Sequence, residues 1–114
     1  MECLFRSVLI IDPRSPHHQK VRDIWIKSGK IHQISSKIQT PKNIIILESK
    51  NSIVSPGWVD IACYGGEPGF EERENLPKLA NAALAGGYTR VAYMPNTNPC
   101  IHSKSEVHFI INKS

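Results

Sequence analysis

The run VSPGWVDIACYGGEPG occupies residues 54–69 and marks a change in the pattern of the chain. Upstream of it, short runs of alternating apolar and polar residues are separated by turn formers, as is typical of β-strands. Within it, Trp58–Ile61 forms a short apolar run that predicts a strand, and a loop rich in glycine and proline follows at 65–69. The strand-to-loop step at this point predicts the start of an α/β region.

The residues that follow predict a helix, a strand and a second helix. Asn75 is a good N-cap, leucines and alanines recur at helical spacing after it, and Gly86-Gly87 ends the pattern. Thr89–Met94 is the next predicted strand. A further helix is predicted from Ser103, because Ser103 and Glu106 have the spacing of a capping box. The order strand, helix, strand, helix is typical of a parallel sheet or barrel.

The first fifty-five residues predict a small antiparallel β-layer. Leu4–Ile11 is rich in β-formers, and the alternating runs 23–27 and 30–34 flank Ser28-Gly29, which is the pattern of a hairpin. Asn43–Glu48 contains four consecutive branched aliphatic residues and is too short for a buried helix. The predicted fold class is therefore α/β with an N-terminal antiparallel β-layer.

Composition excludes several classes of function. The net charge of +4 comes from scattered lysines and arginines with few aromatic residues between them, so no nucleic-acid surface is predicted. No apolar run approaches the roughly 20 residues of a membrane span, and the N-terminus has no pattern of a signal peptide. The three cysteines are widely spaced with no CxxC pair. We therefore expect a cytoplasmic protein without a disulfide framework.

Several ordered motifs in this chain resemble the dihydroorotase family of the amidohydrolase superfamily. The family's first barrel strand begins at a Pro-Gly and continues as Asp-x-His-x-His-x-Arg-x-Pro-Gly. The corresponding segments here are Pro56-Gly57, DIACYGGEPG at 60–69, AALAGGYT at 82–89 and MPNTNP at 94–99. The resemblance implies a small β-domain over residues 1–55 and the first two βα units of a TIM-like barrel over 56–114. A whole barrel of this type needs roughly 250 residues, so we expect it to be incomplete in this chain.

The resemblance also locates a lost metal site. Two imidazoles at positions i and i+2 of a strand point to the same face and can hold one ion, which is zinc in active members of the family. Here those positions carry Ala62 and Tyr64, and the family's substrate-binding arginine falls at Gly66. A methyl group donates nothing to a metal, and a phenol with a pKa near 10 is a poor ligand at neutral pH. We therefore predict no metal ligand, no bound cofactor and no catalytic residue in this chain.

Two neighbouring residues could be functional or structural. Cys63 is offset by one residue from the histidine positions, which favours a buried thiol on the opposite face over a zinc ligand. Asn96 matches the family's substrate-binding asparagine, so it is a candidate for a vestigial substrate contact. The same residue could equally satisfy backbone groups in a turn. The histidines and the glutamates at 67–74 favour exposed positions and a helix N-terminus rather than a site.

The resemblance implies a place in pyrimidine biosynthesis. The leading hypothesis is a non-catalytic dihydroorotase-like protein, since inactive homologues of this type hold aspartate transcarbamoylase trimers together; a homo-oligomer is also expected. One alternative is an active dihydroorotase, or a related cyclic amidohydrolase such as a hydantoinase, whose ligands come from later strands. A free-standing small binding module is the third possibility.

Overall fold

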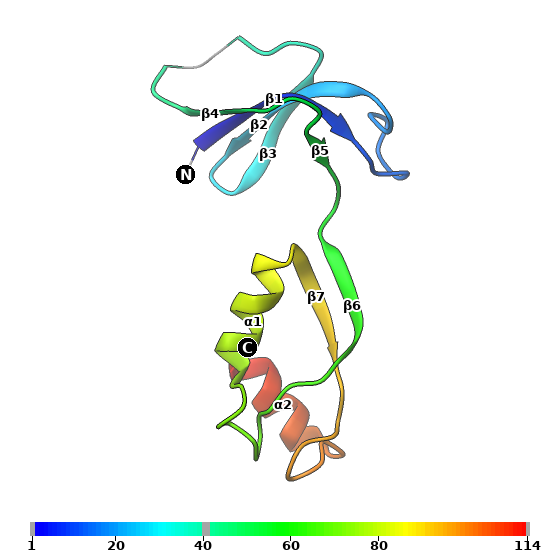
Figure 1. Ribbon diagram of the computed structural model, residues 1–114, viewed down its shortest axis with the longest axis vertical. Helices are drawn as coiled ribbons and strands as arrows, with labels where there is room; N and C mark the ends of the chain where they lie inside the picture. Colours follow the sequence, from blue (N-terminus) through cyan, green and yellow to red (C-terminus); the bar gives the residue numbers. More distant parts are fainter. Residues whose placement is uncertain (1, 40–41, 114) are drawn as a thin grey trace. The chain divides into compact units, whose positions relative to one another are not determined.

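The computed structural model describes residues 2–39 and 42–113. The chain divides into two compact units, Met1–Pro56 and Gly57–Ser114, each with its own secondary structure (Figure 1). Neither helix in the described part of the chain is long and apolar enough to cross a lipid bilayer.

The first unit is a five-stranded sheet. Its strands are β1 (Glu2–Ile10), β2 (Val21–Lys27), β3 (Lys30–Ser35), β4 (Ile45–Glu48) and β5 (Ile53–Val54). The strand order is β3-β2-β1-β4, and β5 also pairs with β1 (Figure 1). The pairs β1–β2 and β2–β3 are antiparallel, whereas β4 and β5 run parallel to β1.

The prediction of an antiparallel layer was therefore wrong for β4, and β5 is a further parallel strand that was not predicted, so the sheet is mixed. A tight turn forces two successive strands to be antiparallel, as between β2 and β3. No such turn joins β3 to β4, because β4 pairs on the other side of β1. Its direction is fixed by packing along β1, which the local sequence pattern does not encode.

The hairpin between β2 and β3 forms at the predicted turn. Ser28 and Gly29 have φ angles of 52° and 73°, and both values lie in the left-handed region. A two-residue hairpin of type I′ requires positive φ at both central positions, because only that geometry matches the twist of the strands. Glycine adopts it at no steric cost, whereas serine adopts it less readily.

A small apolar core holds the first unit together. Val8, Ile10 and Ile24 are buried, and partly buried apolar side chains pack against them: Phe5, Ile26, Ile34 and Val54. These residues come from four strands, so the core depends on the sheet being assembled in its mixed order. Burial of each such side chain contributes roughly 1.5–3 kcal/mol.

A buried carboxylate joins three segments of the first unit. The β1 ladder shifts register between Phe5 and Val8, and the Ser7 N–H there donates to Asp23 Oδ1 at 3.0 Å. Oδ2 accepts from the Ile38 N–H at 2.9 Å and from the Arg6 guanidinium. Burial opposes the charged form of Asp23, but these hydrogen bonds and the Arg6 charge outweigh it and hold its pKa below 3.8.

The second unit contains two parallel strands and two helices. The strands are β6 (Trp58–Cys63) and β7 (Tyr88–Tyr93), and the helices are α1 (Leu76–Ala85) and α2 (Lys104–Lys113) (Figure 1). The predicted N-cap is confirmed, because Asn75 Oδ1 accepts from the Lys78 N–H at 3.0 Å. Gly86 forms the C-cap. Helix α1 packs along β7 and contacts α2.

The strands of the second unit carry exposed apolar side chains. Ile61 on β6 is 83% exposed, and Trp58, Val59 and Val91 are also exposed. An apolar strand of this kind is normally buried on both faces in a parallel sheet. The two helices of this unit therefore leave a large part of its sheet surface uncovered.

Candidate functional site

The predicted site residues lie at the carboxyl ends of β6 and β7, and the structure brings the two following loops together. The Met94 N–H donates to the Cys63 carbonyl at 2.9 Å, and the Asn98 N–H donates to the Pro68 carbonyl at 3.0 Å. In parallel α/β folds the carboxyl ends of the strands are where ligands bind. The two loops are thus the place to test for chemistry.

The end of β6 does not supply the donor atoms that a zinc ion needs. Ala62 lies on β6, and Tyr64 lies one residue past its end; both are exposed. A methyl carbon cannot coordinate, and a phenol remains protonated at neutral pH. Within residues 2–39 and 42–113 no three His, Cys, Asp or Glu side chains converge on one point. The residues present at this strand end do not fit the family's metal.

Gly66, where the resemblance predicts the family's arginine, is buried inside its own loop. Its carbonyl accepts from the Phe70 N–H at 2.7 Å, which closes a tight turn over residues 66–70. A glycine at this position supplies no guanidinium to bind a carboxylate in the two-pronged geometry that arginine provides.

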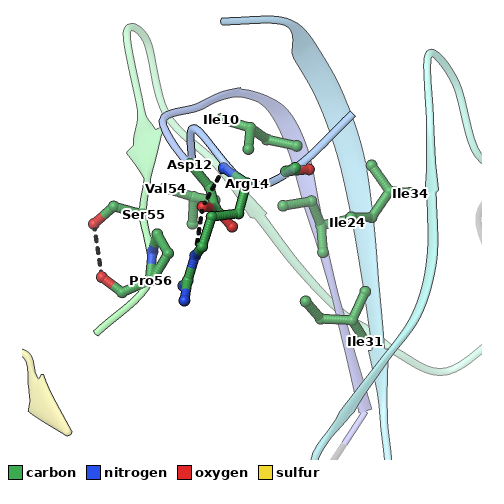
Figure 2. A pocket seen from close by; sticks show the side chains of 10 residues that line it. Ile10, Asp12, Arg14, Ile24, Ile31, Ile34, Val54, Ser55 and Pro56 are labelled. Atoms are coloured by element: carbon green, nitrogen blue, oxygen red, sulfur yellow. Dashed lines mark hydrogen bonds and ion pairs between the residues drawn. The ribbon is translucent and has the colours of Figure 1, made fainter. Parts of the chain in front are cut away.

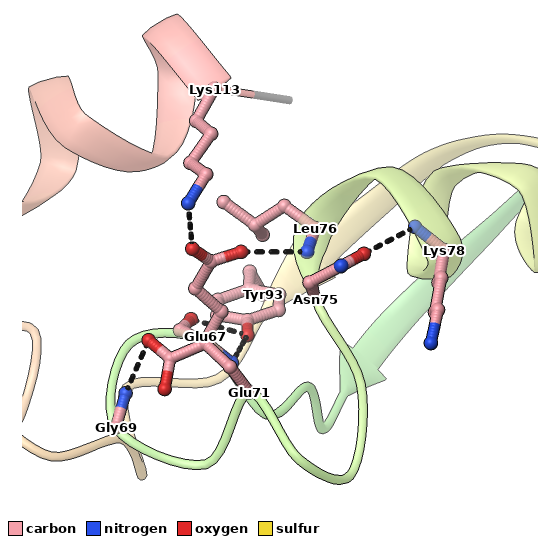
Figure 3. Close-up of polar contacts among 8 residues, drawn as sticks. All are labelled: Glu67, Gly69, Glu71, Asn75, Leu76, Lys78, Tyr93 and Lys113. Carbon is pink, nitrogen blue, oxygen red and sulfur yellow. Dashed lines mark hydrogen bonds and ion pairs between the residues drawn. The ribbon is translucent and has the colours of Figure 1, made fainter.

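The loop after β6 contains a buried acid with a full set of partners (Figure 3). Glu67 is 1% exposed. Its Oε2 accepts from the Leu76 N–H at 2.9 Å, at the start of α1, and its Oε1 pairs with Lys113 in the last turn of α2. The Lys113 and Leu76 hydrogen bonds outweigh burial and lower the pKa of Glu67 below 4.5. The carboxylate is therefore used in structure.

Tyr93 completes this polar network from β7. Its hydroxyl donates to the Glu67 carbonyl at 2.7 Å and accepts from the Glu67 N–H at 3.3 Å. Burial raises the pKa of Tyr93, so the phenol stays protonated and keeps donating at neutral pH. The hydroxyl thus bonds to both backbone polar groups of Glu67, which fixes the loop against β7 (Figure 3).

Comparison with known proteins shows which family this chain resembles. No family model matches the sequence. The dihydroorotase of Clostridium acetobutylicum is 34% identical over 111 residues, and that of Aquifex aeolicus is 35% identical over 114 residues. These alignments cover 97% and 100% of this chain. The chain belongs to the dihydroorotase family. It spans about a quarter of the length of these relatives, 26% in each.

Two solved hydantoinase structures share the fold of this chain. An L-hydantoinase from Arthrobacter aurescens matches 97% of this chain and 24% of its own, with a TM-score of 0.76 and 19% identity. A D-hydantoinase matches 99% of this chain and 24% of its own, with a TM-score of 0.72 and 22% identity. At these identities the likeness concerns the fold alone.

Two further candidate residues of this dihydroorotase-family chain lie at the ends of the two strands: Cys63 is the last residue of β6, and Asn96 follows β7. Asn96 is exposed. Its neighbour Thr97 is buried, and the Thr97 Oγ1 hydroxyl donates to the Pro99 carbonyl within the loop at 2.8 Å. Cys63 is half-buried. Burial, and then the carboxylates of Asp60 and Glu74, raise its pKa, so it is a protonated thiol at neutral pH.

The histidines lie in separate parts of the chain. His102 and His108 flank the start and the middle of α2, and the His102 ring contacts the Cys100 carbonyl at 2.7 Å. His32 on β3 packs edge-on against Trp25, with ring centroids 4.4 Å apart. The His102 and His32 rings therefore each have a contact with a nearby group.

The sequence analysis missed the central part played by Tyr93 and Lys113. It placed four glutamates at a helix N-terminus, but Glu67 alone bonds to an N–H of α1, and Glu71 accepts from Gly69 instead. Nothing in the local pattern marks Lys113 as a partner, because 46 residues separate it from Glu67. The tyrosine at the end of a strand was the available signal.

A hollow in the first unit has less to offer as a site. It measures about 340 Å³, and the side chains around it are mostly apolar: Ile10, Ile24, Ile31, Ile34, Val54 and Pro56 (Figure 2). Of its charged members, Asp12 accepts through Oδ1 from the Arg14 backbone N–H at 3.1 Å and from Arg14 Nε at 3.5 Å, and its two serines, Ser15 and Ser55, bond to nearby backbone. The Arg14 side chain is 82% exposed. A ligand site usually has a few fixed polar groups pointing inward, and this hollow has none of that kind.

Proposed function

We propose that this chain is a non-catalytic dihydroorotase-like polypeptide. Residues 1–55 provide the small β-domain, and residues 56–114 provide the first two βα units of a barrel that is incomplete within this chain. The observation that carries the proposal is the pair Ala62 and Tyr64 at the end of β6, where the family signature has two histidines. Hydrolysis or closure of a cyclic amide needs a divalent metal to activate water and polarise the carbonyl.

The rest of the strand end supports the same conclusion. Gly66 offers no cationic side chain for a substrate carboxylate, and Glu67 is already paired with Lys113. Tyr93 is bonded to backbone. None of these three groups is left to act as an acid, a base or a substrate clamp, and Asn96 remains as a vestigial substrate contact.

A structural role follows from what the chain retains. The fold and an exposed apolar surface on β6 are present, and assembly requires surfaces rather than a metal. We therefore propose a scaffold in pyrimidine biosynthesis, with aspartate transcarbamoylase or further copies of the same protein as partners. The free thiols of Cys3, Cys63 and Cys100 suit a reducing cytoplasm.

The test uses the full-length protein encoded by the gene. We expect less than stoichiometric zinc by metal analysis and no cyclisation of carbamoyl-aspartate above background. The Aquifex aeolicus dihydroorotase, assayed in parallel, is the positive control. Co-purification of aspartate transcarbamoylase without turnover would support the scaffold, whereas stoichiometric zinc together with turnover would eliminate it.

The second candidate is an active dihydroorotase or cyclic amidohydrolase whose ligands lie outside residues 1–114. It is favoured by the name shared by the relatives at 32–35% identity. The two candidates differ in one measurement, because turnover that is lost on chelation and restored by zinc belongs to the enzyme alone.

A further inference from the structure

The two glycines at 65 and 66 lie at crowded positions of the loop after β6. A Cβ atom built on Gly66 would lie 2.5 Å from the Glu74 carbonyl oxygen and 3.0 Å from the Glu74 nitrogen, and closer still to the Phe70 carbonyl oxygen. Non-bonded carbon atoms pack at about 3.5–4.0 Å. All three obstacles are backbone atoms, so rotating a side chain cannot relieve the crowding.

The obstacle at Gly66 is space and not backbone conformation. Its φ lies outside the left-handed region, unlike that of Gly69, which has φ of 96°. An L-residue could therefore adopt the backbone angles of Gly66 if the turn over residues 66–70 and the Glu74 backbone moved away. That movement would break the hydrogen bond from Phe70 to Gly66.

The space beside Gly65 is filled by the Tyr93 ring, which is held in place by hydrogen bonds. A Cβ atom there would lie 2.6 Å from Tyr93 Cζ. The Tyr93 hydroxyl makes hydrogen bonds to the N–H and the carbonyl of Glu67. The Glu67 carboxylate in turn accepts from the Leu76 N–H and pairs with Lys113. The Tyr93 hydroxyl, the buried Glu67 and the start of α1 are therefore linked by hydrogen bonds (Figure 3), and the Cβ position of Gly65 abuts the Tyr93 ring.

We infer that Gly65 and Gly66 allow this loop to pack closely against the start of α1. While the loop keeps this structure, position 66 therefore cannot carry the family's arginine or any other side chain. The inference rests on the proposed function in treating Gly66 as the arginine position. It goes further, because the substrate-binding capacity of this loop is then lost through backbone packing. Replacing single residues would not restore it.

The test compares Gly66→Ala and Gly66→Arg with Gly86→Ala in the full-length protein. Gly86 is the matched control: its φ is −81°, and a Cβ atom there would meet the solvent-exposed Tyr88 ring at 3.2 Å. We expect both Gly66 variants to lower Tm by at least about 5 °C, and Gly86→Ala to leave it within about 2 °C. In hydrogen exchange the amides of Phe70 and Leu76 should lose protection at least tenfold in the Gly66 variants.

A Gly66→Arg protein with unchanged Tm and unchanged Leu76 protection would overturn the inference. So would calorimetric binding of dihydroorotate by that variant. If Gly66→Arg does not fold, the milder Gly66→Ala decides, with Gly86→Ala as reference. Turnover by the natural protein would contradict the proposed function and leave this inference untouched, so the two can fail separately.

Discussion

Glu67 and Lys113 form an ion pair that joins the start of α1 to the last turn of α2. The second carboxylate oxygen of Glu67 accepts from the Leu76 N–H, so one side chain serves both helices. A carboxylate at a helix N-terminus satisfies an N–H that has no partner within the helix and interacts favourably with the helix dipole. The pair therefore carries the contact between the two helices and fixes the loop that precedes α1.

Removal of Glu67 should destabilise the second unit. Glu67→Ala leaves the buried Leu76 N–H without an acceptor and is expected to cost about 1.5–3 kcal/mol, the usual range for hydrogen bonds to a charged group. Glu67→Gln keeps an acceptor but loses the charge, so we expect a smaller cost. Urea unfolding of the two variants measures this, with the exposed Glu72→Gln as control at about 0.5 kcal/mol or less. Equal stability of Glu67→Ala and the natural protein would contradict the assignment.

Acid should weaken the first unit through Asp23. Its folded-state pKa lies below its ordinary value of 3.8, so the folded protein holds this proton less tightly than the unfolded chain does. The stabilisation is therefore complete above about pH 4 and is lost as the pH falls through the lower folded pKa. Asp23→Asn should be less stable at pH 7 by about 1.5–3 kcal/mol, and the difference should shrink below pH 4. Denaturant midpoints measured from pH 7 to pH 3 test this; a gap that stays constant with pH would refute it.

The hairpin turn should respond oppositely to two substitutions. Gly29→Val puts a β-branched residue at φ of 73° and should cost about 1–2 kcal/mol. Ser28→Asn should stabilise the turn by a few tenths of a kcal/mol, because Asn-Gly is the preferred type I′ pair. Hydrogen exchange at the Lys30 amide, next to the turn, reports both effects. A valine variant with natural protection would show that the turn is not of this type.

Restoring the two histidines should restore metal binding without activity. Ala62 and Tyr64 are exposed, so imidazoles fit at both positions, and residues two apart on a strand point the same way. The double variant Ala62→His/Tyr64→His should retain more zinc than Ala62→His alone, as measured by metal analysis after dialysis. Cyclisation of carbamoyl-aspartate should stay at background because Gly66 provides no guanidinium. Turnover near that of a dihydroorotase relative would be the contrary result.

Local structure was predicted well where short-range chemistry decides it. The Asn75 cap, the Gly86 stop and the Ser28-Gly29 turn depend on groups within a few residues of each other, and all three are observed. Strand ends were less accurate: β1 begins at Glu2, two residues before the predicted start. Glu2 is included because it pairs with Lys27 on β2, and such a pairing is not visible in the strand's own pattern.

The candidate site also has features that the local sequence predicted and features that it did not. Motifs that lie together in the sequence identified the loops after β6 and β7, and the missing donors at Ala62 and Tyr64 follow from residue chemistry alone. The roles of Glu67, Tyr93 and Lys113 could not be predicted, since the three residues lie 20 to 46 positions apart. Their contacts depend on how α2 and β7 pack around the loop.

The sequence by itself determined the family, the order of all strands and helices except β5, and the chemical groups available at the end of β6, because these follow from residue identity and local spacing. The tertiary structure alone decided that β4 and β5 run parallel to β1, that Glu67 is buried between two helices, and that backbone atoms fill the space beside Gly66. Direction, burial and crowding arise from contacts between distant segments, and no local pattern of residues specifies them.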